Sequence, residues 1–159
     1  MALVKNTNSY VDLADADIYF GDRLDVAAWT GATDALKEQA LVTATSMLDE
    51  QRWVGIAVSA TQPLAFPRIG TYFDPRIGTE VAFDETETPD RVIKATYEQA
   101  YHLLNNDGLL DSTSSVENIK VGPIELENIK SSSKKSSAVR SLITPMLVNG
   151  NSSLWWRAN

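Results

Sequence analysis

Apolar residues recur at intervals of three and four along four stretches of the chain, and this spacing predicts four helices. The first helix is expected to begin near Asp12, because Asp12 or Ser9 can cap its amino terminus. After a break at 31–33, the second helix is expected from about Thr33 to Arg52. The apolar stripes are Leu13, Ala16, Phe20 and Leu24 in the first helix, and Leu36, Ala40, Ala44, Met47 and Leu48 in the second.

The third helix is expected to begin at 88–90, where a capping Thr precedes Pro and Asp, an arrangement typical of helix starts. Gly108 is expected to end it. The fourth helix is predicted over 138–147, and Pro145 should bend or end it because proline lacks a backbone N–H donor. The stripe of the third helix consists of Ile93, Tyr97, Ala100 and Leu104.

Residues 117–129 alternate between apolar and polar positions around Gly122-Pro123, which predicts two short strands or one bent hairpin. The stretch 131–136 contains only Ser and Lys and is typical of a linker. The predicted fold class is therefore mainly α, a small four-helix bundle with an extended loop between the second and third helices and a short β-hairpin before the last helix. One helical domain is expected over 1–148, followed by a flexible docking tail at 149–159. The predicted core consists of Leu13, Phe20, Leu41, Leu48, Ile93, Tyr97, Leu104 and Leu142, closed at one end by Trp53 and Phe66.

The extended loop at 68–88 overlaps a repeated pentapeptide. Pro-Arg-Ile-Gly-Thr occurs at 67–71 and again at 75–79, which predicts two similar turns lying side by side, although a local duplication without function is an equally open interpretation. A long excursion from a helical domain is usually either functional or disordered, and the aromatic residues of this one argue against disorder. The loop is therefore expected to bind a partner through Arg68, Tyr72, Phe73 and Arg76.

Composition narrows the class of protein. The 159 residues are 43% hydrophobic and 22% charged, as in ordinary soluble globular proteins, and they include no cysteine. The net charge of −7 is uneven, because residues 1–116 hold 8 Lys/Arg against 18 Asp/Glu whereas residues 117–159 hold 6 against 3. An acidic body disfavours nucleic-acid binding through its own surface, since that binding relies on cations that neutralise phosphates. No apolar run is long enough to cross a bilayer, so no membrane partner is expected.

The sequence offers little for catalysis. The single histidine, His102, lies within the third predicted helix, and no glycine-rich phosphate loop occurs. The acidic runs at 12–17 and 84–87 lack the spacing of a calcium loop. We therefore expect no catalytic residue, no metal site and no cofactor, and we predict that the protein is not an enzyme.

Two tryptophans near the end of the chain follow a polar stretch at 149–153. Leaving both indoles in water would forgo several kcal/mol of burial, at ~25 cal/mol per Å². We expect them to pack either on their own domain or on a neighbouring chain, where Trp and Arg are favoured anchors. The predicted docking residues are Leu154, Trp155, Trp156 and Arg157.

Several segments, taken in order over about residues 9–147, resemble a family often labelled DnaT-like single-stranded-DNA-binding, which is found in structural gene clusters of tailed phages. The most specific segments are Arg52–Gly55, Leu64–Arg68 and the Val121-Gly122-Pro123 turn. The other segments that carry the resemblance are 12–20, Trp29, 37–49, 89–104, 120–125 and 139–145.

This family is similar in helical layout to the head-tail connector, or adaptor, proteins of tailed phages. The resemblance implies a structural subunit of a twelve-subunit ring beneath the portal, which joins capsid to tail and lets DNA pass without specific binding. The implied partners are the portal protein, a tail or nozzle protein and neighbouring copies of the chain. The implied location is the head-tail junction of the virion, after assembly in the host cytoplasm. An acidic body fits this role because it would not grip the passing DNA.

The family label leads to a second hypothesis, a single-stranded-DNA-binding accessory protein of replication or packaging. Such binding needs a basic surface with aromatic side chains on which bases stack. In this sequence only the basic residues of 117–159, together with Trp155 and Trp156, could supply one. We rank this hypothesis second to the adaptor.

Overall fold

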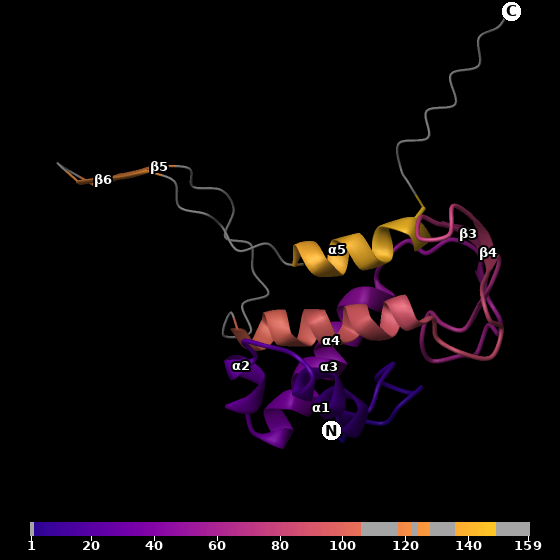
Figure 1. Cartoon of the computed structure of the whole chain (residues 1–159), viewed down its shortest axis with the longest axis horizontal. Coiled ribbons are helices and arrows are strands. Elements are labelled where there is room, and N and C mark those ends of the chain that lie inside the picture. Colours follow the sequence, from indigo (N-terminus) through magenta and orange to yellow (C-terminus); the bar gives the residue numbers. More distant parts are fainter. Residues whose placement is uncertain (1, 106–117, 122–123, 128–135, 149–159) are drawn as a thin grey trace, which may run out of the picture.

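The computed structural model describes residues 2–105, 118–121, 124–127 and 136–148 (Figure 1). Within these ranges the chain forms five α-helices and three two-stranded antiparallel sheets, so the fold mixes helical and β structure and is not a clean four-helix bundle. The helices are α1 (Leu13–Gly21), α2 (Ala27–Thr30), α3 (Asp34–Asp49), α4 (Asp90–Asn105) and α5 (Ser137–Ile143), and a 3₁₀ turn (Thr144–Met146) follows α5. The strands are β1 (Ile56–Ala57), β2 (Arg68–Ile69), β3 (Thr71–Asp74), β4 (Thr79–Ala82), β5 (Asn118–Val121) and β6 (Ile124–Glu127).

Side-chain caps fix the starts of three helices. Asp12 caps α1 by accepting a hydrogen bond from the Asp15 backbone N–H at 2.8 Å, and Thr33 caps α3 in the same way. Ser136 caps α5 by accepting from the Val139 N–H at 3.1 Å. The predicted helix starts near 12 and 33 are confirmed, whereas the predicted end of the second helix is three residues too late. Leu24, which was assigned to the first stripe, lies beyond α1 and is 94% exposed.

Helix α4 occupies the centre of the helical layers. It lies between α5 on one side and α1 to α3 on the other, and it packs on both α3 and α5 (Figure 1). It buries residues on more than one face, and these are Val92, Ala95, Thr96, Tyr97, Gln99, Ala100 and Leu103. A helix that is buried on more than one face ties separate layers into one core.

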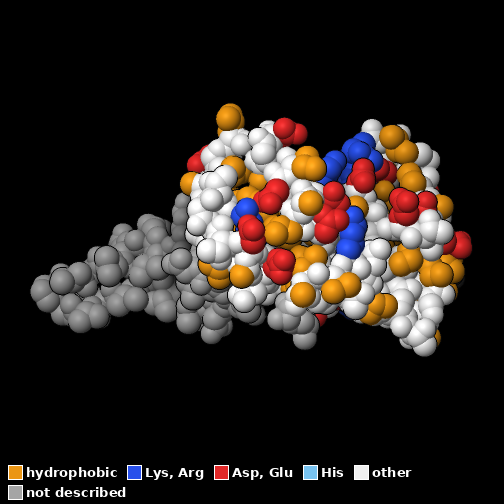
Figure 2. Space-filling model, turned by 90° about the horizontal axis from the view of Figure 1, so that it is seen from below, with side chains coloured by type: hydrophobic (Ala, Val, Ile, Leu, Met, Phe, Trp, Pro, Cys, Tyr) orange, Lys and Arg blue, Asp and Glu red, His pale blue; other side chains and the backbone are white. Residues whose placement is uncertain are grey.

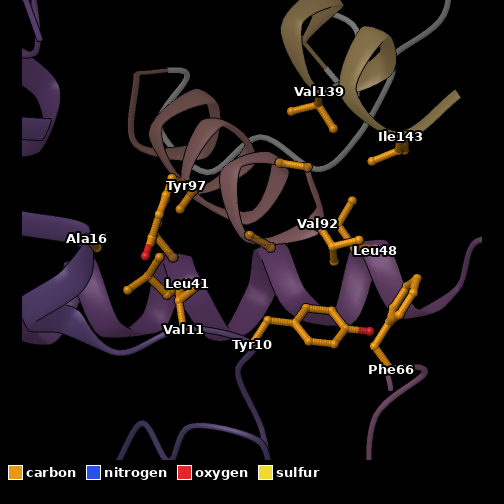
Figure 3. Packing of buried hydrophobic residues seen from close by; sticks show 14 of the residues in the cluster. Tyr10, Val11, Ala16, Leu41, Leu48, Phe66, Val92, Tyr97, Val139 and Ile143 are labelled. Atoms are coloured by element: carbon orange, nitrogen blue, oxygen red, sulfur yellow. The ribbon is translucent and has the colours of Figure 1, made fainter. Parts of the chain in front are cut away.

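The core joins side chains from α3, α4 and α5 with aromatic residues outside the helices, among them Tyr10 and Phe66 (Figure 3). Tyr10 meets Phe66 edge to face with ring centroids 6.1 Å apart, and the Tyr10 hydroxyl donates to Asp49. Of the predicted core, six residues are buried, namely Phe20, Leu41, Leu48, Tyr97, Trp53 and Phe66. The other four are half-buried at its margin, namely Leu13, Ile93, Leu104 and Leu142.

The short helix α2 was not predicted. It places Trp29 against Phe20, with ring centroids 4.3 Å apart, and leaves the indole only 2% exposed. The indole Nε1–H donates to Asp17 Oδ1 at 2.8 Å, so the one polar atom of this buried ring is satisfied. Four residues are too few to show a helical period, which is why the sequence did not predict this helix.

About half of the extended loop predicted at 68–88 is strand, in β2, β3 and β4. Ile56 pairs with Ile69 across β1 and β2, and Tyr72 pairs with Val81 across β3 and β4. Between the two sheets Gly70 has φ +143°, and a Cβ there would lie 2.9 Å from the Gly55 Cα. The two backbones can approach this closely because both positions are glycine.

The two copies of Pro-Arg-Ile-Gly-Thr adopt different conformations. The copy at 67–71 forms β2 and the start of β3, whereas the copy at 75–79 forms the turn between β3 and β4. In the second copy the Gly78 N–H donates to the Asp74 carbonyl at 2.9 Å and Gly78 has φ +70°. The prediction of two similar turns side by side is therefore wrong.

The hairpin predicted at 117–129 is confirmed by the antiparallel pairing of β5 with β6. The predicted fourth helix exists as α5 and the 3₁₀ turn that contains Pro145. Just beyond it the chain pairs with the segment that leaves α3. The Val54 N–H donates to Met146 O at 2.9 Å, and the Val148 N–H donates to Arg52 O at 2.8 Å.

Three predicted features lie outside the described residues. They are Gly108 as the end of the third helix, all of the 131–136 linker except residue 136, and the docking tail at 149–159. None of the helices in the described ranges combines the length and the apolar character that a bilayer crossing requires.

Truncating Leu41 tests the core assignment. Leu41→Ala should lower the free energy of unfolding by about 2–5 kcal/mol, because a fully buried leucine loses its contacts and leaves a cavity. Leu36→Ala on the same helix should change it by less than about 0.5 kcal/mol, because Leu36 is 49% exposed. Urea unfolding monitored by circular dichroism measures both. Equal effects of the two substitutions would contradict the packing described for α3.

Candidate functional site

Arg68, the first predicted contact residue of the loop, is turned toward its own protomer. Its guanidinium donates to the backbone carbonyls of Val54 at 2.9 Å and Ala65 at 3.1 Å, and it also reaches those of Trp53 and Gly55. Partial burial lowers the pKa of Arg68 from its usual value. These contacts hold the segment after α3 against the segment before β2, so Arg68 serves the fold.

The hairpin of β3 and β4 divides its aromatic residues between two faces. Tyr72 stacks on the buried Phe83 with ring centroids 5.0 Å apart, so it faces the core. The next residue along β3, Phe73, points the other way, lies opposite Glu80 and is 55% exposed. Of the two aromatic loop residues predicted to bind a partner, Phe73 is therefore exposed to solvent, whereas Tyr72 is half-buried.

Arg76, the last predicted loop residue, pairs with a buried carboxylate that the sequence did not single out. Asp74 is 2% exposed and accepts from Arg76 Nη2 at 2.9 Å and from Arg91 Nη2 at 2.8 Å. Arg91 belongs to α4, and its Nη1 lies 3.5 Å from the Leu142 carbonyl of α5. Asp74 thus joins the hairpin to α4 and, through Arg91, to α5.

Hydrogen bonds from Arg76, followed by those from Arg91, hold the pKa of Asp74 far below the usual range of an aspartate. The folded state therefore favours the charged form of this carboxylate. The sequence did carry a signal for the local half of this cluster, since Asp followed by Pro and Arg is typical of an Asx turn. The partner on α4 lies 17 residues away and left no such signal.

Lys and Arg side chains of the body are largely occupied by acidic partners. The pairs are Lys5 with Asp12 and Asp15, Arg23 with Glu98, Lys37 with Asp17 and Asp34, and both Arg76 and Arg91 with Asp74. Figure 2 shows the same arrangement on one face, where acidic side chains are widely spread and the few basic ones lie beside them. Among the described side chains, the Lys and Arg residues without an ion pair are Arg52, Arg68, Lys94 and Arg140, and Arg68 donates to backbone carbonyls instead.

Arg140 lies where the acidic body meets the basic last third of the chain. Helix α5 buries Val139 and Ile143 against α4, so Arg140, the residue after Val139, is left exposed. It belongs to residues 117–159, whose 6 Lys/Arg exceed their 3 Asp/Glu. The predicted docking residues Leu154, Trp155, Trp156 and Arg157 belong to the same third and lie outside the described residues.

The acidic runs have structural partners. Asp12 caps α1 and pairs with Lys5, and Asp84 accepts from the Thr86 N–H at 2.7 Å. In the parts of the chain that the structure describes, no group of three or more His, Asp or Glu side chains could hold a metal ion. His102 lies half-buried on α4, as a core-edge histidine would.

In comparison with known proteins, a family described as "Putative DnaT-like ssDNA binding protein" matches residues 2–158. The chain belongs to this family. No curated protein and no solved structure is significantly similar to it.

The family match corrects the interpretation of the chain as a head-tail adaptor. The family is described by its binding of single-stranded DNA, whereas the adaptor hypothesis predicted a portal, a tail protein and a ring of copies as partners and no specific DNA binding. The adaptor role rested on the family's likeness in helical layout to connector proteins, and the acidic residues of 1–116 were taken as support for it. The match extends through the basic residues 117–159, to which that argument does not apply.

Protonation of Asp74 should unlock the hairpin. Because the pKa of Asp74 is depressed in the folded state, its contribution to stability is present above the unfolded-state pKa of about 3.9 and is lost as pH falls through the folded value. Asp74→Asn should therefore lower the melting temperature most at neutral pH, and the difference from the wild type should narrow below about pH 4. Thermal unfolding from pH 2 to 8 measures this, with the exposed Asp22→Asn as control. A difference that does not depend on pH would contradict the role assigned to the charge.

Proposed function

We propose that this protein binds single-stranded DNA through its basic last third, residues 117–159, and that it acts as a binding protein rather than as an enzyme. The observation that carries the proposal is the family match, which includes this basic third. The charges and contacts of the described residues support it in the three steps that follow.

The first step concerns the phosphates. Binding to a nucleic-acid backbone draws its affinity from cations that are free to replace the condensed counterions. Most cations of the body already neutralise carboxylates, so their contact with a phosphate would first require an ion pair to break. In the last third, Lys120, Lys130, Lys134, Lys135, Arg140 and Arg157 outnumber the acidic residues two to one.

The second step concerns the bases. Single strands expose base faces, which stack on aromatic side chains without regard to sequence. Trp29 and Trp53 are 2% and 5% exposed and cannot offer a ring face to a base. Phe73 is the exposed aromatic residue of the described body, and Glu80 lies opposite it on the neighbouring strand. Trp155 and Trp156, which stand beside Arg157, are therefore the residues that we assign to stacking.

The third step concerns how the body presents this third of the chain. Helix α5 is fixed to α4 by Val139 and Ile143, and the Val148 N–H is bonded to the Arg52 carbonyl. Residue 148 therefore has a defined position on the body, and Trp155 follows it by seven residues. The folded body anchors the basic segment and, being acidic, disfavours a second, nonspecific mode of binding.

Neutralising two lysines should weaken binding and reduce its dependence on salt. Each phosphate contact contributes about 0.7 to the slope of log affinity against log salt concentration for single strands, so Lys134→Ala/Lys135→Ala should reduce that slope by up to about 1.4. The control is Arg52→Ala/Lys94→Ala, which removes the same charge from exposed positions of the body and should leave the slope within error. Fluorescence anisotropy with a labelled oligothymidine at several salt concentrations measures both. Equal losses in the two variants would mean that only net charge matters and would contradict the assigned segment.

Removing the indoles should weaken binding at any salt concentration. Base stacking on one aromatic residue is worth about 1–3 kcal/mol, so Trp155→Ala or Trp156→Ala should each lower the affinity by about 5- to 150-fold. Phe73→Ala, which truncates an exposed aromatic residue of the body, is the matched control and should change the affinity little. The same titration measures all three. If the wild-type protein does not bind single-stranded DNA near physiological salt, the proposed function is wrong.

A further inference from the structure

A shallow groove runs along the outer side of α3. Its volume is about 420 Å³, and the residues that line it are Val42, Thr45, Ser46 and Asp49 of α3, Glu50, Asn8 and Leu64. Val42 and Leu64 give it an apolar part, whereas Asp49 and Glu50 make the end near the carboxyl terminus of α3 acidic. This volume falls in the range of sites that hold a drug-sized group, and one indole fits within it.

Within the described ranges, no Lys or Arg side chain forms an ion pair with the carboxylates at this end of the groove. Asp49 Oδ1 accepts from the Tyr10 hydroxyl and from the Ala65 N–H at 3.1 Å, and its second oxygen accepts no hydrogen bond from the described residues. Glu50 is exposed and forms no ion pair with them. The groove therefore offers acceptors to an indole N–H or a guanidinium, beside an apolar wall.

The direction of the chain after α5 points to this groove. Trp53 and Leu147 form an antiparallel bridge, with Val54 bonded to Met146 and Arg52 bonded to Val148. In antiparallel pairing each further residue of one strand meets an earlier residue of the other. If this pairing continued beyond Val148, it would lead from Arg52 toward Glu50, which is the acidic end of the groove.

The segment after Val148 is long enough to reach the groove. Trp155 lies seven residues after Val148, which allows a span of up to about 23–25 Å. The groove extends along α3 from Glu50 to Val42, eight residues, or about 12 Å of helix. Trp155 and Trp156 can thus reach every part of it, and Arg157 can meet the acidic end.

We propose that, in the absence of DNA, residues Leu154–Arg157 dock in the α3 groove of their own protomer, with an indole on Val42 and Leu64 and Arg157 near Asp49 and Glu50. Together with the proposed function, on which this part rests, docking makes the groove a competitor of single-stranded DNA. A strand can stack on Trp155 and Trp156 only after they leave the groove. The apparent affinity for single-stranded DNA is therefore the intrinsic affinity multiplied by the fraction of molecules whose indoles are free.

Filling the groove tests the proposal. Ser46 lines the groove and is exposed, so Ser46→Phe should occupy it without disturbing the core. The control is Ser141→Phe, the same change at an exposed position of α5. The readout is acrylamide quenching of tryptophan fluorescence without DNA. The contribution of the buried Trp29 and Trp53 is obtained from Trp155→Phe/Trp156→Phe and subtracted.

We expect Trp155 and Trp156 to be protected from acrylamide in the wild type and in Ser141→Phe, and to be quenched like free indole in Ser46→Phe. Protection should not change with protein concentration, since the contact is within one chain. Indoles that are fully quenched in the wild type, or protection that disappears on dilution, would overturn docking within one protomer.

A charge exchange provides a second test that does not alter the shape of the groove. Glu50→Lys should raise the quenching of the two indoles, and the added change Arg157→Glu should restore their protection. Glu85→Lys, an equal charge change at an exposed position away from the groove, should have no effect. If the second substitution fails to restore protection, Arg157 does not bind at the acidic end.

Competition with DNA is tested by a separate binding measurement on the same variants. If the docked form is about 90% populated, Ser46→Phe should bind oligothymidine about tenfold more tightly than the wild type or Ser141→Phe. An unchanged affinity despite released indoles would overturn the competition. If no variant binds DNA, the proposed function fails, whereas the quenching result without DNA still decides whether the segment docks.

Discussion

The structure depends on the burial of α4. Its position between α5 and α1 to α3 takes Val92, Ala95, Ala100 and Leu103 out of water, and complete burial of an aliphatic side chain is worth about 1.5–3 kcal/mol. Even a polar residue of this helix is accommodated, because the Thr96 hydroxyl donates to the Val92 carbonyl at 2.9 Å. Because α5 has its own apolar face on α4, residues 137–146 are held on the body.

The packing around α4 also decides how charge is distributed. Arg91 lies at the start of α4 and is largely buried, so it needs an anionic partner, which Asp74 of the hairpin supplies. Elsewhere, Lys5, Arg23 and Lys37 are each matched by carboxylates of neighbouring elements. A body whose cations are used in this way is poorly suited to hold a phosphate backbone. This is why the function proposed for the chain is assigned to residues outside the body's core.

The acidity of the body supported the wrong function because it was treated as a property of the whole chain. Repulsion between an acidic surface and DNA acts over about a Debye length, roughly 8 Å at physiological salt, so it weakens quickly with distance from that surface. The family match covers the acidic and basic parts alike, so the basic part has to be considered by itself. The adaptor hypothesis gave too much weight to the acidic part of the chain and too little to the basic part.

Features that depend on neighbours in the sequence could be determined from the sequence alone. The caps at Asp12 and Thr33, the proline near the start of α4 and the alternation around Gly122 each act over a few residues, so they located the helices and the β5–β6 hairpin. Six of the ten core residues predicted from the sequence are buried, including Phe20 and Leu41.

Contacts between distant residues were decided only by the tertiary structure. Trp29 is buried because Phe20 and Asp17 meet it, and Arg68 is turned inward because carbonyls from 53–55 and Ala65 surround it. The two identical pentapeptides differ in conformation because one is paired with β1 and the other closes a hairpin. The local sequence determines which conformations a segment can adopt. Packing against residues that are distant in the sequence selects one of these conformations, because only packing provides the burial that stabilises it.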